Sequence, residues 1–167
     1  MDRSTETYLF VDIDGVLNTR SYLRKQIKTR GKCSRFKWCP EAVKHLNSLC
    51  TNFDSRLVIS SSWRYEFSLE ELRNIFSKNG ISSEWIIGTT PSMVALTVEE
   101  NHCRGHEIDA WLREEGSKPY NYLILDDLET MLPHQEKFLI RTEMDHGFAD
   151  PALFQKAQSI LKGADET

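Results

Sequence analysis

Residues 8–18 read YLFVDIDGVLN, an apolar run that ends in two aspartates, a glycine and, three residues later, an asparagine. The run at 8–13 is continuous rather than alternating, which is typical of a strand covered on both faces in a parallel sheet. Similar runs recur at 57–59, within RLVISS, and at 122–125, within YNYLILDD. The sequence therefore predicts buried parallel strands with polar residues at their ends.

Helical patterns separate these runs. Four segments place apolar side chains on one side at helical spacing: residues 41–49, 68–80, 104–115 and 151–162. Ser68 followed by Glu71 is a capping box, and Gly80 and Gly163 are predicted to end their helices. Further strands are predicted at 84–88 and 137–142. Strands alternating with helices predict an α/β domain around a mostly parallel sheet.

Length and composition set the class of protein. A chain of 167 residues with 40% hydrophobic residues is the size of one domain, predicted over 1–167. No stretch approaches the roughly 18 apolar residues that cross a bilayer, and the polar N-terminus lacks a signal-peptide pattern. We expect a soluble, cytoplasmic protein. The sequence does not determine its oligomeric state.

Charge is distributed unevenly. The formal net charge is -4, yet residues 19–38 hold eight of the 21 basic residues and no acidic one, which leaves 13 against 25, or -12, elsewhere. Tyr22, Phe36 and Trp38 are interleaved with these charges, as stacking on single-stranded bases requires. This basic segment favours a large polyanion, RNA or DNA, as partner.

Cysteines give little support for a structural metal. Cys33, Cys39 and His45 have a spacing that matches no common zinc site, and no fourth ligand is evident. His45 is expected to be solvated. With no secretory signal, the cysteines are expected to be free thiols in a reducing compartment.

Polar side chains follow three of the predicted strands where each ends. They are four carboxylates and two hydroxyls: Asp12, Asp14, Ser60, Ser61, Asp126 and Asp127. The carboxyl ends of parallel strands meet at one edge of the sheet, where ligands bind. Converging carboxylates repel one another unless a cation compensates, and an all-oxygen ligand set suits Mg²⁺. The same reasoning predicts a phosphorylated substrate, with the serine hydroxyls donating hydrogen bonds to its phosphate.

These residues resemble the four ordered motifs of the haloacid dehalogenase-like (HAD) phosphohydrolases. The motifs correspond, in chain order, to DIDG at 12–15, Ser60, Arg104 and the pair Asp126-Asp127. The segments LVISSSWR, GTTP, RGHEIDAWL and YLILDDLETM further resemble the small HAD domains associated with RNA repair proteins, over most of residues 8–162. Thr130 departs from the pattern, since many relatives carry an acidic residue there. The resemblance implies a Rossmannoid three-layer sandwich with a small flap-type cap at about 19–38.

The resemblance also implies a mechanism. Asp12 attacks phosphorus to form an aspartyl-phosphate, a covalent route open to carboxylates. Asp14 protonates the leaving alcohol and then deprotonates water. Ser60 and Arg104 hold phosphate oxygens, and Gly15 lets the backbone turn tightly beside them. The metal ligands implied are Asp12, Asp14 through its backbone carbonyl, Asp126 and, with the departure at Thr130, Asp127.

Alternatives remain open at several positions. Ser61 competes with Ser60 as the phosphate ligand, and Arg64 competes with Arg104. Trp63 is expected to pack rather than to stack on bases. The functional hypothesis is a Mg²⁺-dependent phosphatase of RNA or DNA ends. Its competitors are a phosphatase of small esters or phosphoproteins, and a non-catalytic nucleic-acid-binding module.

Overall fold

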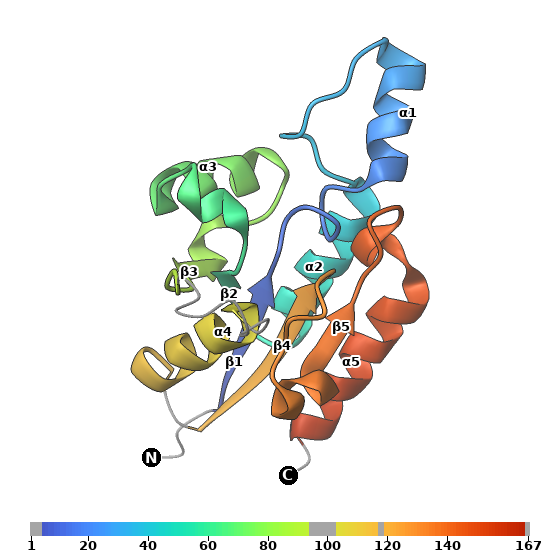
Figure 1. Ribbon diagram of the computed structural model, residues 1–167. Helices are drawn as coiled ribbons and strands as arrows, with labels where there is room; N and C mark the ends of the chain where they lie inside the picture. The colour runs from blue at the N-terminus through green and yellow to red at the C-terminus, as the bar shows by residue number, and fades with distance from the viewer. Residues whose placement is uncertain (1–4, 94–102, 117–118, 166–167) are drawn as a thin grey trace.

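The computed structural model describes residues 5–93, 103–116 and 119–165, and its centre is an all-parallel sheet of five strands (Figure 1). The strands are β1 (Glu6–Val11), β2 (Arg56–Ile59), β3 (Ile86–Thr89), β4 (Tyr120–Asp126) and β5 (Leu139–Arg141). Their order is β3-β2-β1-β4-β5. The central strand β1 pairs with β2 from Tyr8↔Arg56 to Val11↔Ile59 and with β4 over its full length. The strands that carry the predicted motifs are therefore adjacent.

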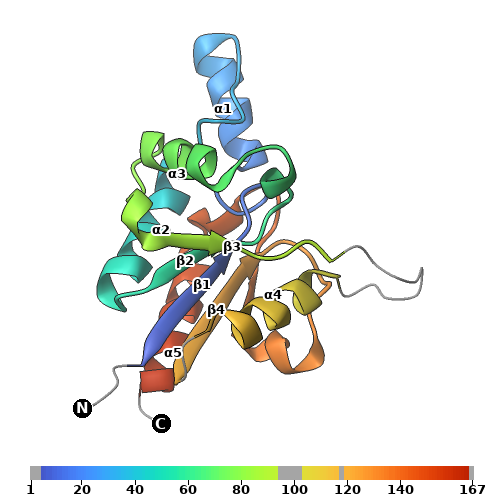
Figure 2. The same cartoon turned by 90° about the vertical axis from the view of Figure 1, so that its left-hand side faces the viewer.

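Helices cover both faces of the sheet (Figures 1 and 2). The helices are α1 (Arg20–Arg30), α2 (Pro40–Asn52), α3 (Leu69–Lys78), α4 (Cys103–Glu114) and α5 (Pro151–Asp165). Short 3-10 turns lie at η1 (Ser62–Tyr65), η2 (Ser83–Trp85), η3 (Pro133–Phe138) and η4 (Gly147–Ala149). The predicted α/β architecture is confirmed, and among the described helices none is both long and apolar enough to cross a bilayer.

The side chains of β1 point alternately to the two faces of the sheet, and each face has its own hydrophobic core. Leu9 and Val11 are fully buried among side chains of α2, α3 and α5. Tyr8 and Phe10 point the other way, onto α4, where both rings meet Trp111 edge to face. Successive side chains of a strand lie on opposite faces, so a sheet covered twice needs apolar residues at every position.

Element ends differ in places from the sequence expectations. The capping box of Ser68 and Glu71 is present at the start of α3. Gly163 does not end α5, which continues to Asp165, because glycine is tolerated within a helix and no left-handed cap forms there. Part of the strand predicted at 137–142 is instead the 3-10 turn η3.

The segment predicted as a basic flap forms a helical arm. We call residues 20–38 the basic arm: α1 followed by a return limb, 31–38, standing at the carboxyl edge of the sheet (Figure 1). Thr19 caps the start of α1, and Gly31 ends it with a left-handed φ of 73°. Buried Gln26 joins the limb to the helix, donating to the Lys37 carbonyl (3.1 Å) and accepting from the Ser34 amide (3.1 Å). All eight basic side chains of the arm are exposed, and the described residues include two carboxylate partners for them, Asp145 and Glu66.

The aromatic residues of the arm have different environments. Trp38 is 2% exposed and packs edge to face on Trp63 and Phe76, so the expectation that it stacks on bases is wrong. Its burial completes the core where the return limb meets α3, and Asn79 fixes it by accepting the Trp38 amide (2.9 Å). Phe36 is 44% exposed and remains accessible.

His45 and the cysteines carry no metal site within the described residues. His45 is buried, not solvated: its ring stacks on Phe154 at 4.4 Å, and Nδ1 lies 2.8 Å from the Phe148 carbonyl. This packing seats α2 on α5. Cys33 is exposed at the far end of the arm, and Cys39 precedes α2.

Candidate active site

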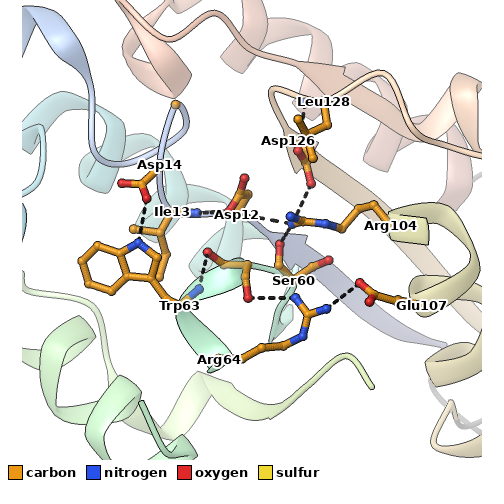
Figure 3. A network of polar contacts seen from close by, with 12 residues as sticks. Asp12, Ile13, Asp14, Ser60, Trp63, Arg64, Arg104, Glu107, Asp126 and Leu128 are labelled. Atoms are coloured by element: carbon orange, nitrogen blue, oxygen red, sulfur yellow. Dashed lines mark hydrogen bonds and ion pairs between the residues drawn. The ribbon is translucent and has the colours of Figure 1, made fainter. Parts of the chain in front are cut away.

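Three carboxylates converge at the carboxyl edge of the sheet. Asp12 directly follows β1, Asp126 is the last residue of β4, and Asp127 is next to it. One oxygen from each lies within 4.8 Å of the others. Backbone amides orient two of them: Ile13 donates to Asp12 Oδ1 (2.7 Å) and Leu128 to Asp126 Oδ1 (2.9 Å) (Figure 3). Parallel pairing of β1 with β4 places these strand ends side by side.

Burial makes it energetically costly for all three carboxyl groups to be ionised at once, which raises their pKa values. Burial raises the pKa of Asp12 to about 6, although Arg104 and a hydrogen bond from Ser61 lower it. Burial and the charge of Asp12 raise the pKa of Asp126 to about 7, against the opposing effect of Arg104. Burial also raises the pKa of Asp127. Together the three side chains form an anionic pocket suited to a cation.

Arg104 enters this pocket from the first turn of α4. Its guanidinium Nη1 lies 3.1 Å from Asp126 Oδ2 and 3.8 Å from Asp12 Oδ1, and it also bonds the Ser60 carbonyl (Figure 3). Gly105 allows the close packing that holds this end of the helix, because a Cβ there would lie 2.7 Å from the Leu132 amide nitrogen. Arg104 therefore contacts carboxylates from two strands at once.

Two hydroxyls follow β2 on the other side of Asp12. The Ser60 amide donates to the Val11 carbonyl (2.9 Å), which places Ser60 directly beside the end of β1. The Ser60 hydroxyl is buried without a hydrogen-bond partner in the described part of the chain. The Ser61 hydroxyl instead accepts from the Trp63 amide (3.4 Å) and bonds Asp12. Ser60 is thus the serine with a hydroxyl free for a ligand.

Gly15 makes the turn after β1 possible. Its φ is +78°, a left-handed value, and a Cβ would lie 2.6 Å from Asp127 Oδ2 and 2.7 Å from Met144 Sδ. Both the backbone conformation and the close approach require glycine. Beyond Asp127 the surface forms a hollow of about 400 Å³ lined by Arg141, Thr142, Glu143 and Met144.

Asp14 lies apart from the three converging carboxylates. Its Oδ1 accepts a hydrogen bond from Asn18 Nδ2 (2.7 Å), and its Oδ2 accepts one from Trp63 Nε1 (2.8 Å) (Figure 3). Each oxygen of the Asp14 carboxyl group therefore accepts one hydrogen bond, and the two donors fix its orientation. Its side chain is not among the three convergent carboxylates, and binding of a metal by its backbone carbonyl stays a prediction.

Arg64 forms an ion pair with Glu107 and not with any of the three convergent carboxylates. Its side chain is 6% exposed and forms a buried ion pair with Glu107 (2.6 Å), while Nη1 donates to the Ser61 carbonyl (2.8 Å). Glu107 in turn accepts from the Met93 amide (3.0 Å). Arg64 thus ties the turn after β2 to α4, one helical turn from Arg104. The sequence offered no signal for Glu107, whose partner is 43 residues away.

The donor set fits magnesium. Asp12, Asp126 and Asp127 are the one convergent group of metal-ligating side chains found across residues 5–93, 103–116 and 119–165. They offer only oxygen atoms, which hard divalent cations prefer. Thr130 contributes no carboxylate, and Asp127 is the third acidic side chain of the group.

Comparison with known families agrees with this arrangement. The family model described as the HAD domain in Swiss Army Knife RNA repair proteins matches residues 8–153, which include every residue of the site described above. Searches of curated proteins and of solved structures found no match. The ordered motifs, the parallel sheet and the match over most of the chain place this protein in the family of HAD domains found in Swiss Army Knife RNA repair proteins.

Proposed function

We propose that this protein is a Mg²⁺-dependent phosphatase that removes terminal phosphates from RNA or DNA through an aspartyl-phosphate. The observation that carries this proposal is the convergence of Asp12, Asp126 and Asp127 around Arg104, beside the free hydroxyl of Ser60. Such a site supplies a nucleophile, a cation and anion-binding groups within one pocket. A family of HAD domains is consistent with phosphoryl chemistry.

The residues of the chain divide the reaction between them. A carboxylate oxygen of Asp12 forms a bond to phosphorus as the bond to the leaving oxygen breaks, and that oxygen departs with the electron pair. Asp14 gives it a proton, and then takes a proton from the water that attacks the aspartyl-phosphate. Inorganic phosphate leaves and both carboxyl groups return to their first state. The Ser60 hydroxyl and the Arg104 guanidinium hold the phosphoryl oxygens.

Asp12, Asp126 and Asp127 would hold the metal ion. When bound, magnesium supplies positive charge between the nucleophilic carboxylate and the phosphate, which otherwise repel each other. Arg104 supplies part of that charge itself, from a fixed position 3.1 Å from Asp126.

The basic arm supports a polymeric substrate. The arm carries eight exposed cationic side chains, and its backbone stands at the carboxyl edge of the sheet (Figure 1). Phosphate contacts made by such residues release counterions and give strong binding to polyanions. A small phosphate ester has too few charges to use the whole arm.

A substrate panel tests the proposal. Phosphate release is measured from a 3′-phosphorylated oligonucleotide, a 5′-phosphorylated one, a mononucleotide and a phosphopeptide, each with Mg²⁺ and with chelator. We expect release from an oligonucleotide in Mg²⁺ alone, and none from the Asp12→Asn variant. Equal or faster release from the mononucleotide contradicts the polymeric substrate. Oligonucleotide binding that persists in chelator, with no release from any compound, contradicts catalysis and favours a binding module.

A further inference from the structure

The carboxylate of Asp14 is held by two donors from separate elements. Asn18, four residues later in the same turn, donates to Oδ1, and Trp63, from η1 after β2, donates to Oδ2 (Figure 3). The two distances, 2.7 and 2.8 Å, are those of strong hydrogen bonds. Two donors on opposite oxygens fix the rotation of the carboxyl group. Each oxygen keeps a second lone pair for a proton.

Trp63 is itself held rigidly. Its side chain is 1% exposed, and the rings of Phe36, Trp38 and Phe67 lie 5.6, 6.0 and 5.6 Å away. The Arg35 guanidinium lies 4.8 Å above the indole, a cation–π contact. Three of these four neighbours belong to the return limb of the basic arm.

The return limb is fixed to the body by further contacts. Arg35 bonds Glu66, just after η1, at 2.6 Å. Asn79, at the end of α3, donates to the Phe36 carbonyl at 2.9 Å. The limb therefore forms one wall of the pocket that contains the indole. Any change in how the limb packs is transmitted to Trp63.

We infer that Trp63 is a positioning residue for proton transfer by Asp14, and that the return limb of the basic arm holds Trp63 in place for this role. The inference rests on the proposed phosphatase function. Its physical basis is that proton transfer needs the carboxyl group within hydrogen-bond reach of the leaving oxygen. The indole N–H keeps the carboxyl from rotating away without taking part in the reaction.

Leaving-group dependence separates this role from a general loss of structure. An alkoxide leaving from an oligonucleotide needs the proton of Asp14 as the phosphorus–oxygen bond breaks. A dinitrophenolate is stable without a proton, so its release does not depend on Asp14. Both compounds give the same aspartyl-phosphate, whose hydrolysis needs Asp14, so the comparison is made on the first step alone. In that step a variant that misplaces Asp14 releases the oligonucleotide slowly and dinitrophenolate at the normal rate, whereas a variant that is merely less folded is slow with both.

The first experiment compares Trp63→Phe with wild type on both compounds, using whichever phosphorylated oligonucleotide the wild type hydrolyses faster. The rates are measured in single turnovers with enzyme in excess, which report the first step. General acid–base catalysis contributes about 10²–10⁴-fold, so we expect the single-turnover rate for the oligonucleotide to fall by roughly tenfold or more, with its affinity unchanged. The single-turnover rate of dinitrophenolate release should change by less than about threefold. Equal losses on the two compounds, or no loss on either, overturn the positioning role.

Two further variants protect the comparison. Trp85→Phe makes the same substitution at a partly buried tryptophan that packs against the core, and should leave the ratio of the two activities unchanged. Benzothienylalanine at position 63 keeps the shape of the side chain and replaces N–H by sulfur. It should reproduce the loss seen in Trp63→Phe. Wild-type activity on both compounds would be contrary to the inference.

The role of the arm is tested with a matched pair. Arg35→Gln removes the cation above Trp63, and Lys37→Gln removes the same charge from an exposed lysine on the same limb. Both variants remove one charge of the arm and should weaken oligonucleotide binding alike, so the two compounds are compared by their single-turnover rates at saturation. We expect the Arg35 variant alone to lower the ratio of the oligonucleotide rate to the dinitrophenyl phosphate rate. An unchanged ratio in Arg35→Gln refutes the part assigned to the limb. If wild type releases phosphate from neither compound, the proposed function fails instead, and the two failures are thus distinguishable.

Discussion

Replacing Asp126 by asparagine should stabilise the protein in the absence of metal. The Asp126 side chain is fully buried, and burial with the charge of Asp12 raises its pKa from an ordinary 3.8 to about 7. In the unfolded chain it ionises near pH 4, whereas in the folded protein it stays protonated until about pH 7. The folded state thus binds more protons in this interval, and stability falls as pH rises through it.

The size of the effect follows from the same pKa difference. One pKa unit corresponds to about 1.4 kcal/mol, so an upper limit for ionising Asp126 is on the order of 4 kcal/mol. The attraction of Arg104 is already included, and asparagine can still accept the Leu128 amide. We expect Asp126→Asn to raise the free energy of unfolding by roughly 2–4 kcal/mol at pH 8, and by no more than about 1.6 kcal/mol at pH 5.

Denaturant unfolding in chelator at pH 5 and pH 8 measures this difference. Glu84→Gln is the control, since it removes the same charge at a position outside the core, and it should be near neutral at both pH values. Added Mg²⁺ should stabilise wild type at pH 8 more than it stabilises Asp126→Asn. A variant that is less stable than wild type at pH 8, or that differs equally at both pH values, would refute the electrostatic reasoning.

Three more predictions concern the neighbouring residues. Arg104→Met removes the cation between Asp12 and Asp126, and breaking a buried ion pair from one side should lower the free energy of unfolding by about 3–5 kcal/mol in chelator, measured by denaturant unfolding. Gly15→Ala should lose the stabilisation by Mg²⁺ in thermal unfolding because its Cβ meets Asp127, while Gly31→Ala, with a similar φ and open space around it, should keep that stabilisation. Neutralising Lys25 and Lys28 together should weaken the salt dependence of binding to a single-stranded oligonucleotide. The slope of log affinity against log salt concentration should fall in magnitude by roughly 0.7 for each phosphate contact that is lost, and an unchanged slope would exclude these lysines from the binding surface.

The sheet and the convergence of acidic residues were predictable because both follow from local pattern. Continuous apolar runs such as 8–13 and 122–125 indicate strands buried on both faces. Once the strands are parallel, residues directly after them must share an edge. The adjacency of Asp12 and Asp126 thus requires only that β1 and β4 pair.

The sequence does not predict contacts that depend on how distant side chains pack. Trp63 is expected to pack, and it does, but its bond to Asp14 links residues 49 apart. His45 is expected in solvent because its helix position alone does not reveal the ring of Phe154. Arg64 is a candidate substrate ligand because it follows the serines closely in sequence. Its actual partner, Glu107, lies on a helix that follows much later in the chain, so the sequence does not predict their ion pair.

The basic arm is predicted only in part. The resemblance implies a flap at this place in the chain, and the sequence pattern does not predict its helix. Thr19 and Gly31 are cap signals that bracket the 11-residue helix, but few apolar residues between them mark a buried face. The burial of Gln26 and Trp38 depends on the return limb folding back. A side chain such as Gln26 gives no such indication from sequence.

The central claim is that Asp12 becomes the phosphorus acceptor. It is tested most directly by mixing the protein with Mg²⁺ and a phosphorylated oligonucleotide, quenching in acid within one turnover, and identifying modified peptides by mass spectrometry. We predict a phosphoryl group on the peptide that carries Asp12, absent in chelator and in Asp12→Asn. Phosphate release without any modified Asp12 peptide, or a protein that releases none from any ester with Mg²⁺ present, would contradict the account.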